Sequence, residues 1–233
     1  MPDPIRACLF DLDGVLTQTA RVHAAAWKEM FDEYLRERAA RSGEPVVPFD
    51  AVADYDEYVD GRPRYDGVRS FLVSRGIDAS EATIRLLGDR KNTLVVELIE
   101  RDGVEAYDGS IRYVRAVRDS GLSRAVVSSS ANTRAVLAAA QISDLFDVVI
   151  DGVTAELEHL HGKPAPDTFL AGAKAVGREP AEAAVFEDAL AGVAAGSAGG
   201  FGLVVGVDRV GQRAALQAHG ADIVVEDLAE LLA

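Results

Sequence analysis

The sequence predicts an α/β protein with a doubly wound, parallel, Rossmann-like sheet as its core and a helical cap domain inserted after the first strand. An apolar, strand-like run lies close to the N-terminus, and short β-branched runs alternate with helical patterns from about residue 107 onward. The stretch between these two regions contains no convincing parallel strand. Alternation of strands and helices indicates a parallel sheet that is covered by helices on both faces.

The first strand is expected at Ala7–Phe10, and a polar loop follows it directly. A helix is then expected from about Thr19 to Ala40, because apolar residues recur there at three- and four-residue intervals. Those residues are Val22, Ala26, Met30 and Tyr34. A link with two prolines follows at 42–48, and shorter helical stretches continue to about Glu100.

The later strands complete the predicted sheet. They are expected at 125–128, 148–150, 184–186, 203–205 and 223–225, with helices between them. The predicted core domain is therefore 1–18 and 101–233, and the predicted cap domain is 19–100. Because the first crossover carries the insert, we expect the cap to act as a lid over the sheet edge next to Asp11.

Composition narrows the classes of function. The chain has 233 residues, enough for a core domain with an insertion, and its formal net charge of −14 argues against a nucleic acid partner. No apolar stretch is long enough to span a bilayer, and the N-terminus lacks a basic region followed by an apolar one. We expect a cytoplasmic protein without membrane contact, either a monomer or a weak homo-oligomer.

Two carboxylates follow the first predicted strand, in the run Asp11-Leu12-Asp13-Gly14. The carboxyl edge of an open α/β sheet is where such folds bind ligands, so one acid could attack a substrate while the other moves a proton. The alternative is an ordinary turn, because Asp and Gly are common turn residues. The other three motifs bear on this choice.

The second motif is a polar run from Ser128 to Asn132, between a predicted strand and an Ala-rich helix. Hydroxyls and backbone N–H groups at the start of a helix suit an anion such as phosphate. Simple capping of the helix is the alternative, and it needs only one of these residues.

The third motif places Lys163 in a loop with two prolines, Pro164 and Pro166. Prolines stiffen the loop and favour a fixed position for the lysine. A solvated loop lysine is the alternative interpretation.

The fourth motif is Glu187-Asp188, at the end of another apolar strand and before a helix of small residues. Acids at a helix start can simply complement the helix dipole. Acids at the ends of two strands of one sheet can instead converge on a hard cation such as Mg²⁺.

In order and position, the four motifs together resemble those of the haloacid dehalogenase superfamily, and the resemblance covers essentially the whole chain. Further residues make the chain similar to the β-phosphoglucomutase-like subfamily. They lie in the predicted cap, at Thr19, His23 and Trp27, at 61–64 and at 90–92. The sequence departs from the subfamily at Ser129, where a mutase often has Ala.

The resemblance implies a role for each matching residue. Asp11 would be the nucleophile, Asp13 the general acid/base, and Ser129 with Lys163 the phosphate clamp. Mg²⁺ would be bound by four acids: Asp11, Asp13, Glu187 and Asp188. Substrate contacts would come from Ser128 and Asn132 in the core and from Thr19, His23, Trp27, Gly61, Arg64 and Lys91 in the cap, with Arg64 on the distal phosphate.

The implied reaction is Mg²⁺-dependent phosphoryl transfer through an aspartyl phosphate. Its substrate would be a small sugar phosphate, interconverted between β-glucose 1-phosphate and glucose 6-phosphate through the 1,6-bisphosphate. A sugar-phosphate phosphatase is the alternative within the same superfamily, and a non-catalytic sugar-phosphate-binding protein is a third possibility. Trp27 and His23, four residues apart, could also be an ordinary packed pair on one helix face.

Overall fold

A computed structural model describes residues 4–43 and 45–232 of the chain. It divides into two compact units. One unit contains the described residues up to Gln18, the segment Gly61–Pro63, and the chain from Val104 onward; the other contains Thr19–Asp60 and Arg64–Gly103. The short segment Gly61–Pro63 thus belongs to the first unit although both of its flanks belong to the second.

The first unit is built on a six-stranded parallel sheet with strand order β3-β2-β1-β4-β5-β6. This order is that of a doubly wound α/β fold, which confirms the predicted fold class. The strands are β1 Ala7–Phe10, β2 Ser123–Val127, β3 Val148–Ile150, β4 Ala183–Glu187, β5 Leu203–Val207 and β6 Ile223–Val225. The helices of this unit are α4 Asp108–Asp119, α5 Thr133–Ala139, α6 Gly152–Leu157, α7 Asp167–Ala175, α8 Leu190–Ala198 and α9 Arg213–Ala218.

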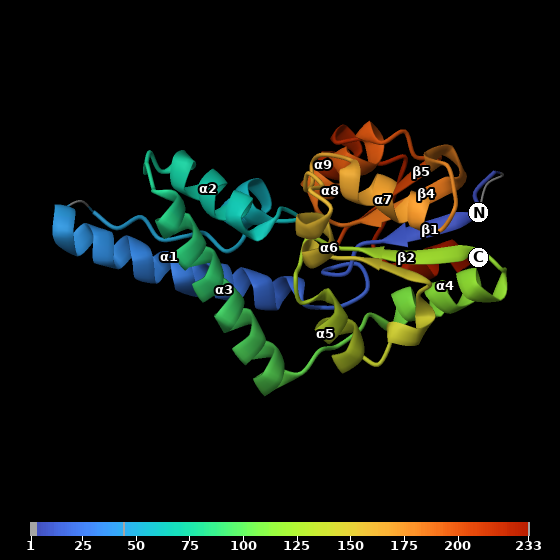
Figure 1. Cartoon of the computed structure of the whole chain (residues 1–233), viewed down its shortest axis with the longest axis horizontal. Helices are drawn as coiled ribbons and strands as arrows, with labels where there is room; N and C mark the ends of the chain where they lie inside the picture. The colour runs from blue at the N-terminus through green and yellow to red at the C-terminus, as the bar shows by residue number, and fades with distance from the viewer. Residues whose placement is uncertain (1–3, 44, 233) are drawn as a thin grey trace. The chain divides into compact units, whose positions relative to one another are not determined.

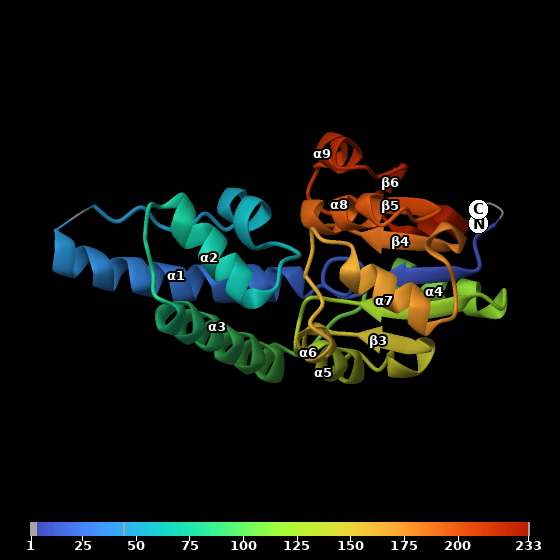
Figure 2. The ribbon, with the colours of Figure 1, turned by 45° about the horizontal axis from the view of Figure 1, so that its top comes forward.

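Helices cover both faces of the sheet, with α7 and α8 on one face and α4 on the other (Figures 1 and 2). Alternate residues of β1 therefore enter different cores. Leu9 packs with Phe169 of α7, whereas Phe10 stacks on Phe186 at 4.6 Å between ring centroids and meets Tyr113 of α4 edge-on. This burial on both sides explains why the strands read as continuous apolar runs rather than as alternating ones.

The second unit is helical, formed by α1 Ala20–Ser42, α2 Arg64–Ser74 and α3 Glu81–Asp102, with a π-helical turn at Tyr55–Val59. Its apolar core contains a cluster of aromatic rings. Phe31 contacts Trp27, Phe49 and Phe71, with ring centroids 5.3, 5.2 and 4.2 Å away. No helix in the described part of the chain is long and apolar enough to cross a membrane.

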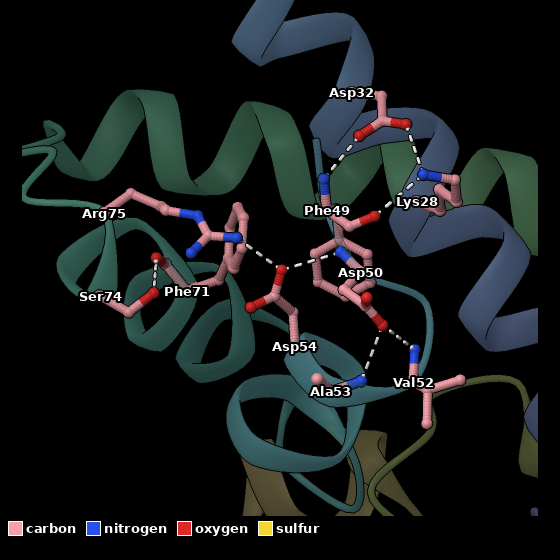
Figure 3. A network of polar contacts seen from close by, with 10 residues as sticks. All are labelled: Lys28, Asp32, Phe49, Asp50, Val52, Ala53, Asp54, Phe71, Ser74 and Arg75. Carbon is pink, nitrogen blue, oxygen red and sulfur yellow. Dashed lines mark hydrogen bonds and ion pairs between the residues drawn. The ribbon is translucent and has the colours of Figure 1, made fainter. Parts of the chain in front are cut away.

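A polar network fixes the irregular chain before the π-helical turn (Figure 3). Asp32 of α1 accepts hydrogen bonds from the Lys28 ammonium and from the Phe49 backbone N–H, both at 2.8 Å. Asp54 accepts from the Asp50 N–H at 2.8 Å and from the Arg75 guanidinium at 2.6 Å. The segment thus gains from side chains the partners that no neighbouring strand supplies.

Candidate active site

The register of the sheet brings three of the four motifs to one edge. Phe10 of β1 lies opposite Val126 of β2 and Phe186 of β4, so the residues that follow these strands emerge side by side. The Asp11 N–H donates to the Phe186 carbonyl at 2.9 Å, which continues the ladder by one residue. Asp11, the serine run and Glu187-Asp188 are therefore neighbours because of strand pairing.

The lysine of the third motif lies at the centre of this edge. Its ammonium donates to Asp11 Oδ1 at 2.5 Å, to Glu187 Oε1 at 2.7 Å and to the Val127 carbonyl at 3.2 Å. It also lies over the ring of Phe169, 4.8 Å from the centroid. Lys163 is 2% exposed, so it is not the solvated loop cation of the alternative interpretation.

Burial and the neighbouring charges shift the pKa values of Asp11, Glu187 and Lys163 in opposite directions. Burial raises the pKa of Asp11, and the neighbouring Lys163 ammonium opposes that rise. Burial likewise raises the pKa of Glu187 to about 7 against the same ammonium. Burial alone would lower the pKa of Lys163, but the carboxylates of Asp11 and Glu187 raise it above the ordinary value. The two carboxylates thus favour the charged form of the buried Lys163 side chain.

Glu187 has both carboxylate oxygens engaged by nitrogen donors. Oε1 accepts from Lys163, and Oε2 accepts from the Ala189 N–H at 2.6 Å. A side chain at Gly192 would stand 1.7 Å from Oε1, so a glycine is required where α8 passes this carboxylate. The geometry thus favours a role for Glu187 in positioning Lys163 over its predicted role as a metal ligand.

Asp188 instead lies against the loop that carries Asp13. A Cβ added to Gly14 would stand 1.7 Å from Asp188 Oδ2, and Gly14 has φ +91°, which favours glycine. Among the described residues, no group of three or more His, Cys, Asp or Glu side chains gathers as a ready metal cage. Mg²⁺ does not need such a cage, because it is usually bound by one or two carboxylates together with water and substrate phosphate.

The donor set fits a hard divalent cation. Asp11, Asp13 and Asp188 offer oxygen ligands on adjoining loops, and the buried acids outnumber the single charge of Lys163. A cation would offset this excess of negative charge.

The hydroxyls of Ser128 and Ser129 have different hydrogen-bond partners. Ser128 is 2% exposed and directly follows Val127, whose carbonyl contacts Lys163, and its Oγ accepts from the Ser130 N–H at 3.1 Å. The Ser129 hydroxyl donates to the Gly61 carbonyl at 2.8 Å. The structure thus brings Ser128 close to the lysine and engages Ser129 with the segment 61–63. Asn132 is the N-cap residue of α5 but makes no side-chain cap bond, so capping does not explain it.

The predicted cap residues lie in the helical unit, apart from Gly61. Lys91 is 6% exposed, its ammonium is 2.9 Å from His23 Nδ1, and it lies over the Trp27 ring at 4.7 Å. Burial and the Lys91 charge lower the pKa of His23 well below its ordinary value. Trp27 is 3% exposed in the core of the helical unit, a position that the packing alternative also predicts.

Arg64 and Thr19 are the remaining predicted cap residues. Arg64 opens α2, donates to the Tyr65 hydroxyl at 3.1 Å and lies 3.7 Å from Asp89. Thr19 is buried at the N-cap of α1.

Three polar residues near the acids have no counterpart in the sequence motifs. Asp208, Arg209 and Gln212 lie in the loop after β5, where Arg209 contacts the Gly14 carbonyl and Gln212 the Asp188 carbonyl. Their only sequence signal is their place after a predicted strand of the same sheet.

Comparisons with known proteins agree with this arrangement. A sequence model of the family described as haloacid dehalogenase-like hydrolase matches residues 5–200. The chain is 56% identical to β-phosphoglucomutase of Mycobacterium bovis, across 100% of this chain and 93% of that protein. It is 31% identical to hexitol phosphatase A of Escherichia coli, across 82% of this chain and 78% of that protein.

A solved structure of β-phosphoglucomutase from Clostridium difficile superposes with a TM-score of 0.78 at 27% identity, across 97% of this chain and 93% of that one. This agreement extends across both the sheet and the helical insert. The chain therefore is an enzyme and belongs to the haloacid dehalogenase-like hydrolase family, as its four motifs predict.

Proposed function

We propose that this enzyme is a β-phosphoglucomutase that transfers a phosphoryl group through Asp11, interconverting β-glucose 1-phosphate and glucose 6-phosphate. The observation that carries the proposal is the buried Lys163 ammonium bound to Asp11 Oδ1 at 2.5 Å, at the carboxyl end of β1. The 56% identity to a β-phosphoglucomutase across the whole chain supports the choice of substrate.

Asp11 is the proposed nucleophile. An oxygen of its carboxylate attacks the phosphorus of the bisphosphate, so that a new O–P bond forms while the bond to the sugar oxygen breaks. Attack requires the ionised carboxylate, and the Lys163 ammonium favours that form against the effect of burial. The same ammonium reduces repulsion between the acid and the incoming anion.

Asp13 is the proposed proton carrier. It lies two residues from the nucleophile on the same loop and is half-buried, and it can donate a proton to the departing sugar oxygen. In the reverse half-reaction it removes the proton from the attacking sugar hydroxyl, and the phosphoryl group returns to the sugar. One residue thus serves both directions of the exchange.

Mg²⁺ is the proposed cofactor, held by Asp11, Asp13 and Asp188. When bound, it would neutralise charge on the transferring phosphoryl group. Glu187 is left out of this ligand set, since its oxygens contact Lys163 and Ala189.

For the substrate phosphates, we propose Ser128, Asn132 and Lys163 near Asp11 and Arg64 for the distal group. Thr19, His23, Trp27, Gly61 and Lys91 remain proposed as contributors from the cap, and we retain the proposed division into a core domain at 1–18 and 101–233 and a cap domain at 19–100. These assignments follow the motif matches, and the contact of Lys163 with Val127 supports Ser128 as the serine nearest to the phosphoryl group.

A sugar-phosphate phosphatase is the second candidate, favoured by the 31% identity to a hexitol phosphatase. The two reactions differ in whether a sugar hydroxyl or water accepts the phosphoryl group from Asp11. A phosphorus NMR time course with β-glucose 1-phosphate, Mg²⁺ and a trace of the 1,6-bisphosphate distinguishes them. Glucose 6-phosphate without inorganic phosphate supports the mutase, whereas accumulating inorganic phosphate supports the phosphatase.

Asp11→Asn tests the nucleophile in the same experiment. The amide is a far weaker nucleophile than the carboxylate, so we expect both isomerisation and hydrolysis to disappear. Asp147→Asn, a change on the surface beyond the site, is the matched control and should retain full turnover. Turnover that persisted in Asp11→Asn would remove Asp11 from the reaction.

A further inference from the structure

The loop between β5 and α9 contacts both acid-bearing loops of the site. We propose that this Asp208 turn (residues 208–213) sets their separation, with Arg209 and Gln212 as positioning residues for the bound divalent cation. The inference rests on the proposed function, because it concerns the cation that Asp11, Asp13 and Asp188 are proposed to hold.

The ladder of the sheet does not itself fix these two loops against each other. The Asp11 N–H donates to the Phe186 carbonyl, one residue after the end of β1, and β4 continues only to Glu187, which pairs with Gly206 of β5. Asp13, Gly14 and Asp188 lie beyond these pairings. Other contacts must therefore hold the ligands at the spacing that a small cation requires.

Arg209 supplies the contact to the first loop. Its Nε donates to the Gly14 carbonyl at 3.0 Å, and its guanidinium lies over the Tyr107 ring at 3.7 Å from the centroid. One Nη donates to the Glu226 carbonyl at 2.7 Å, and the side chain is 15% exposed. The planar guanidinium is thus anchored at several points before it reaches Gly14.

Gln212 supplies the contact to the second loop. Its side-chain amide donates to the Asp188 carbonyl at 3.0 Å. The two loops touch where Asp188 lies against the Cα of Gly14. Arg209 and Gln212 therefore hold the two peptides on either side of the closest approach between the loops.

The turn that carries both residues is hydrogen-bonded to one carboxylate. Asp208 Oδ1 accepts from the N–H groups of Gly211 and Gln212 at 2.7 and 2.8 Å, and Oδ2 accepts from the Arg213 N–H at 3.1 Å. Asp208 is 9% exposed. A single carboxylate thus fixes the backbone from which both positioning side chains extend.

Residues that orient metal ligands without touching the metal change metal affinity when they are replaced. We expect Arg209→Met and Gln212→Met each to weaken the binding of Mn²⁺ about 10-fold. Arg209→Lys keeps a donor but loses the planar fork, so it should recover only part of the affinity. Activity should fall through a higher cation requirement rather than through a changed KM for the sugar phosphate.

The experiment titrates the full chain with Mn²⁺ alone and measures free Mn²⁺ by electron paramagnetic resonance, so that it needs no turnover. Arg118→Met and Gln217→Met are the matched controls, since both residues are exposed helical residues of the same unit. Thermal unfolding in the presence of a chelator checks that each variant folds. Gln212→Met loses only one neutral hydrogen bond, so this variant tests the inference if Arg209→Met does not fold.

Weaker Mn²⁺ binding in the turn variants, with the controls unchanged, supports the inference. Affinity equal to wild type in both folded variants overturns it. If wild type binds Mn²⁺ and the turn variants bind it more weakly, but wild type does not convert the sugar phosphate, the proposed reaction fails while the positioning of the cation ligands by the turn is supported. A wild-type chain that binds no Mn²⁺ overturns both.

Discussion

The buried lysine is the residue that distinguishes this edge of the sheet from an ordinary strand end. Lys163 contacts the acid after β1, the acid that ends β4 and the last carbonyl of β2. An unpaired buried ammonium would be very unfavourable, so the site is stable only because its acids are present. The same contacts hold the nucleophile of the proposed reaction beside a cation.

Ser128 and Ser129 can be told apart by substitution. Because the Ser129 hydroxyl donates to Gly61, we expect Ser129→Ala to lower the free energy of unfolding by about 1 kcal/mol, the worth of one neutral hydrogen bond. Its KM for sugar phosphate should stay near that of wild type. Urea unfolding and initial rates measure the two effects, with Ser128→Ala as the comparison.

Ser128→Ala should show a different kinetic pattern, with a weaker reaction, because Ser128 directly follows the Val127 carbonyl that contacts Lys163. A large rise in KM for Ser129→Ala alone would return the phosphate role to Ser129, as the motif match implies.

At the scale of elements, the polar network of Figure 3 makes the helical unit depend on a few carboxylates. Asp54→Ala removes the acceptor of both the Arg75 guanidinium and the Asp50 N–H. We expect a loss of about 2 kcal/mol in the free energy of unfolding, since the hydrogen bonds to this charged group are partly shielded from water. Urea titration followed by circular dichroism measures it.

Asp66→Ala is the control, because Asp66 is exposed and its pair with Arg69 on α2 should contribute less than about 1 kcal/mol. Equal losses in the two variants would mean that the network does not fix the segment before the π-helical turn.

The contact between His23 of α1 and Lys91 of α3 should make the free energy of unfolding depend on pH. The pKa of His23 is lowered in the folded chain, so below the ordinary value of 6.5 the unfolded chain binds a proton that the folded chain does not. The free energy of unfolding should therefore fall as the pH is lowered, by up to about 1.4 kcal/mol per pH unit between the unfolded and folded pKa values.

His23→Gln removes this titration, so its stability should depend less steeply on pH between 7 and 5 than that of wild type. Thermal unfolding of both chains across that range is the measurement. Parallel curves would mean that His23 is protonated as easily in the folded chain as in the unfolded one.

Across the whole molecule, the positions of the strands can be predicted from the sequence better than the contacts between side chains. The expected strands at 7–10, 148–150 and 223–225 coincide with β1, β3 and β6, because each is a short, uninterrupted run of apolar residues. β2 and β4 differ from expectation by one or two residues at both ends, and β5 differs by two residues at one end, because a ladder can begin or stop on polar or small residues.

The candidate site could be predicted where a residue type has a local sequence signal. Asp11 and Asp188 have one because they directly follow strands, and Lys163 has one because its loop contains two prolines. Arg209 and Gln212 have none, since an arginine or glutamine in a loop carries no chemistry of its own until the fold brings it to a carbonyl. The contact of Glu187 with Lys163 could not be predicted either, because a carboxylate at a strand end can bind a metal or a lysine equally well.

Removal of the cation should abolish catalysis but leave the whole molecule folded. The two cores are apolar, and the described residues contain no ready metal cage, so a chelator should leave the thermal unfolding midpoint within a few degrees of its starting value. Conversion of sugar phosphate should stop, because Lys163 alone does not offset the buried acids and an incoming phosphate. Excess Mg²⁺ should restore it fully. Turnover that survived chelation would exclude the proposed cofactor, and cooperative unfolding on chelation would show that the cation is part of the fold.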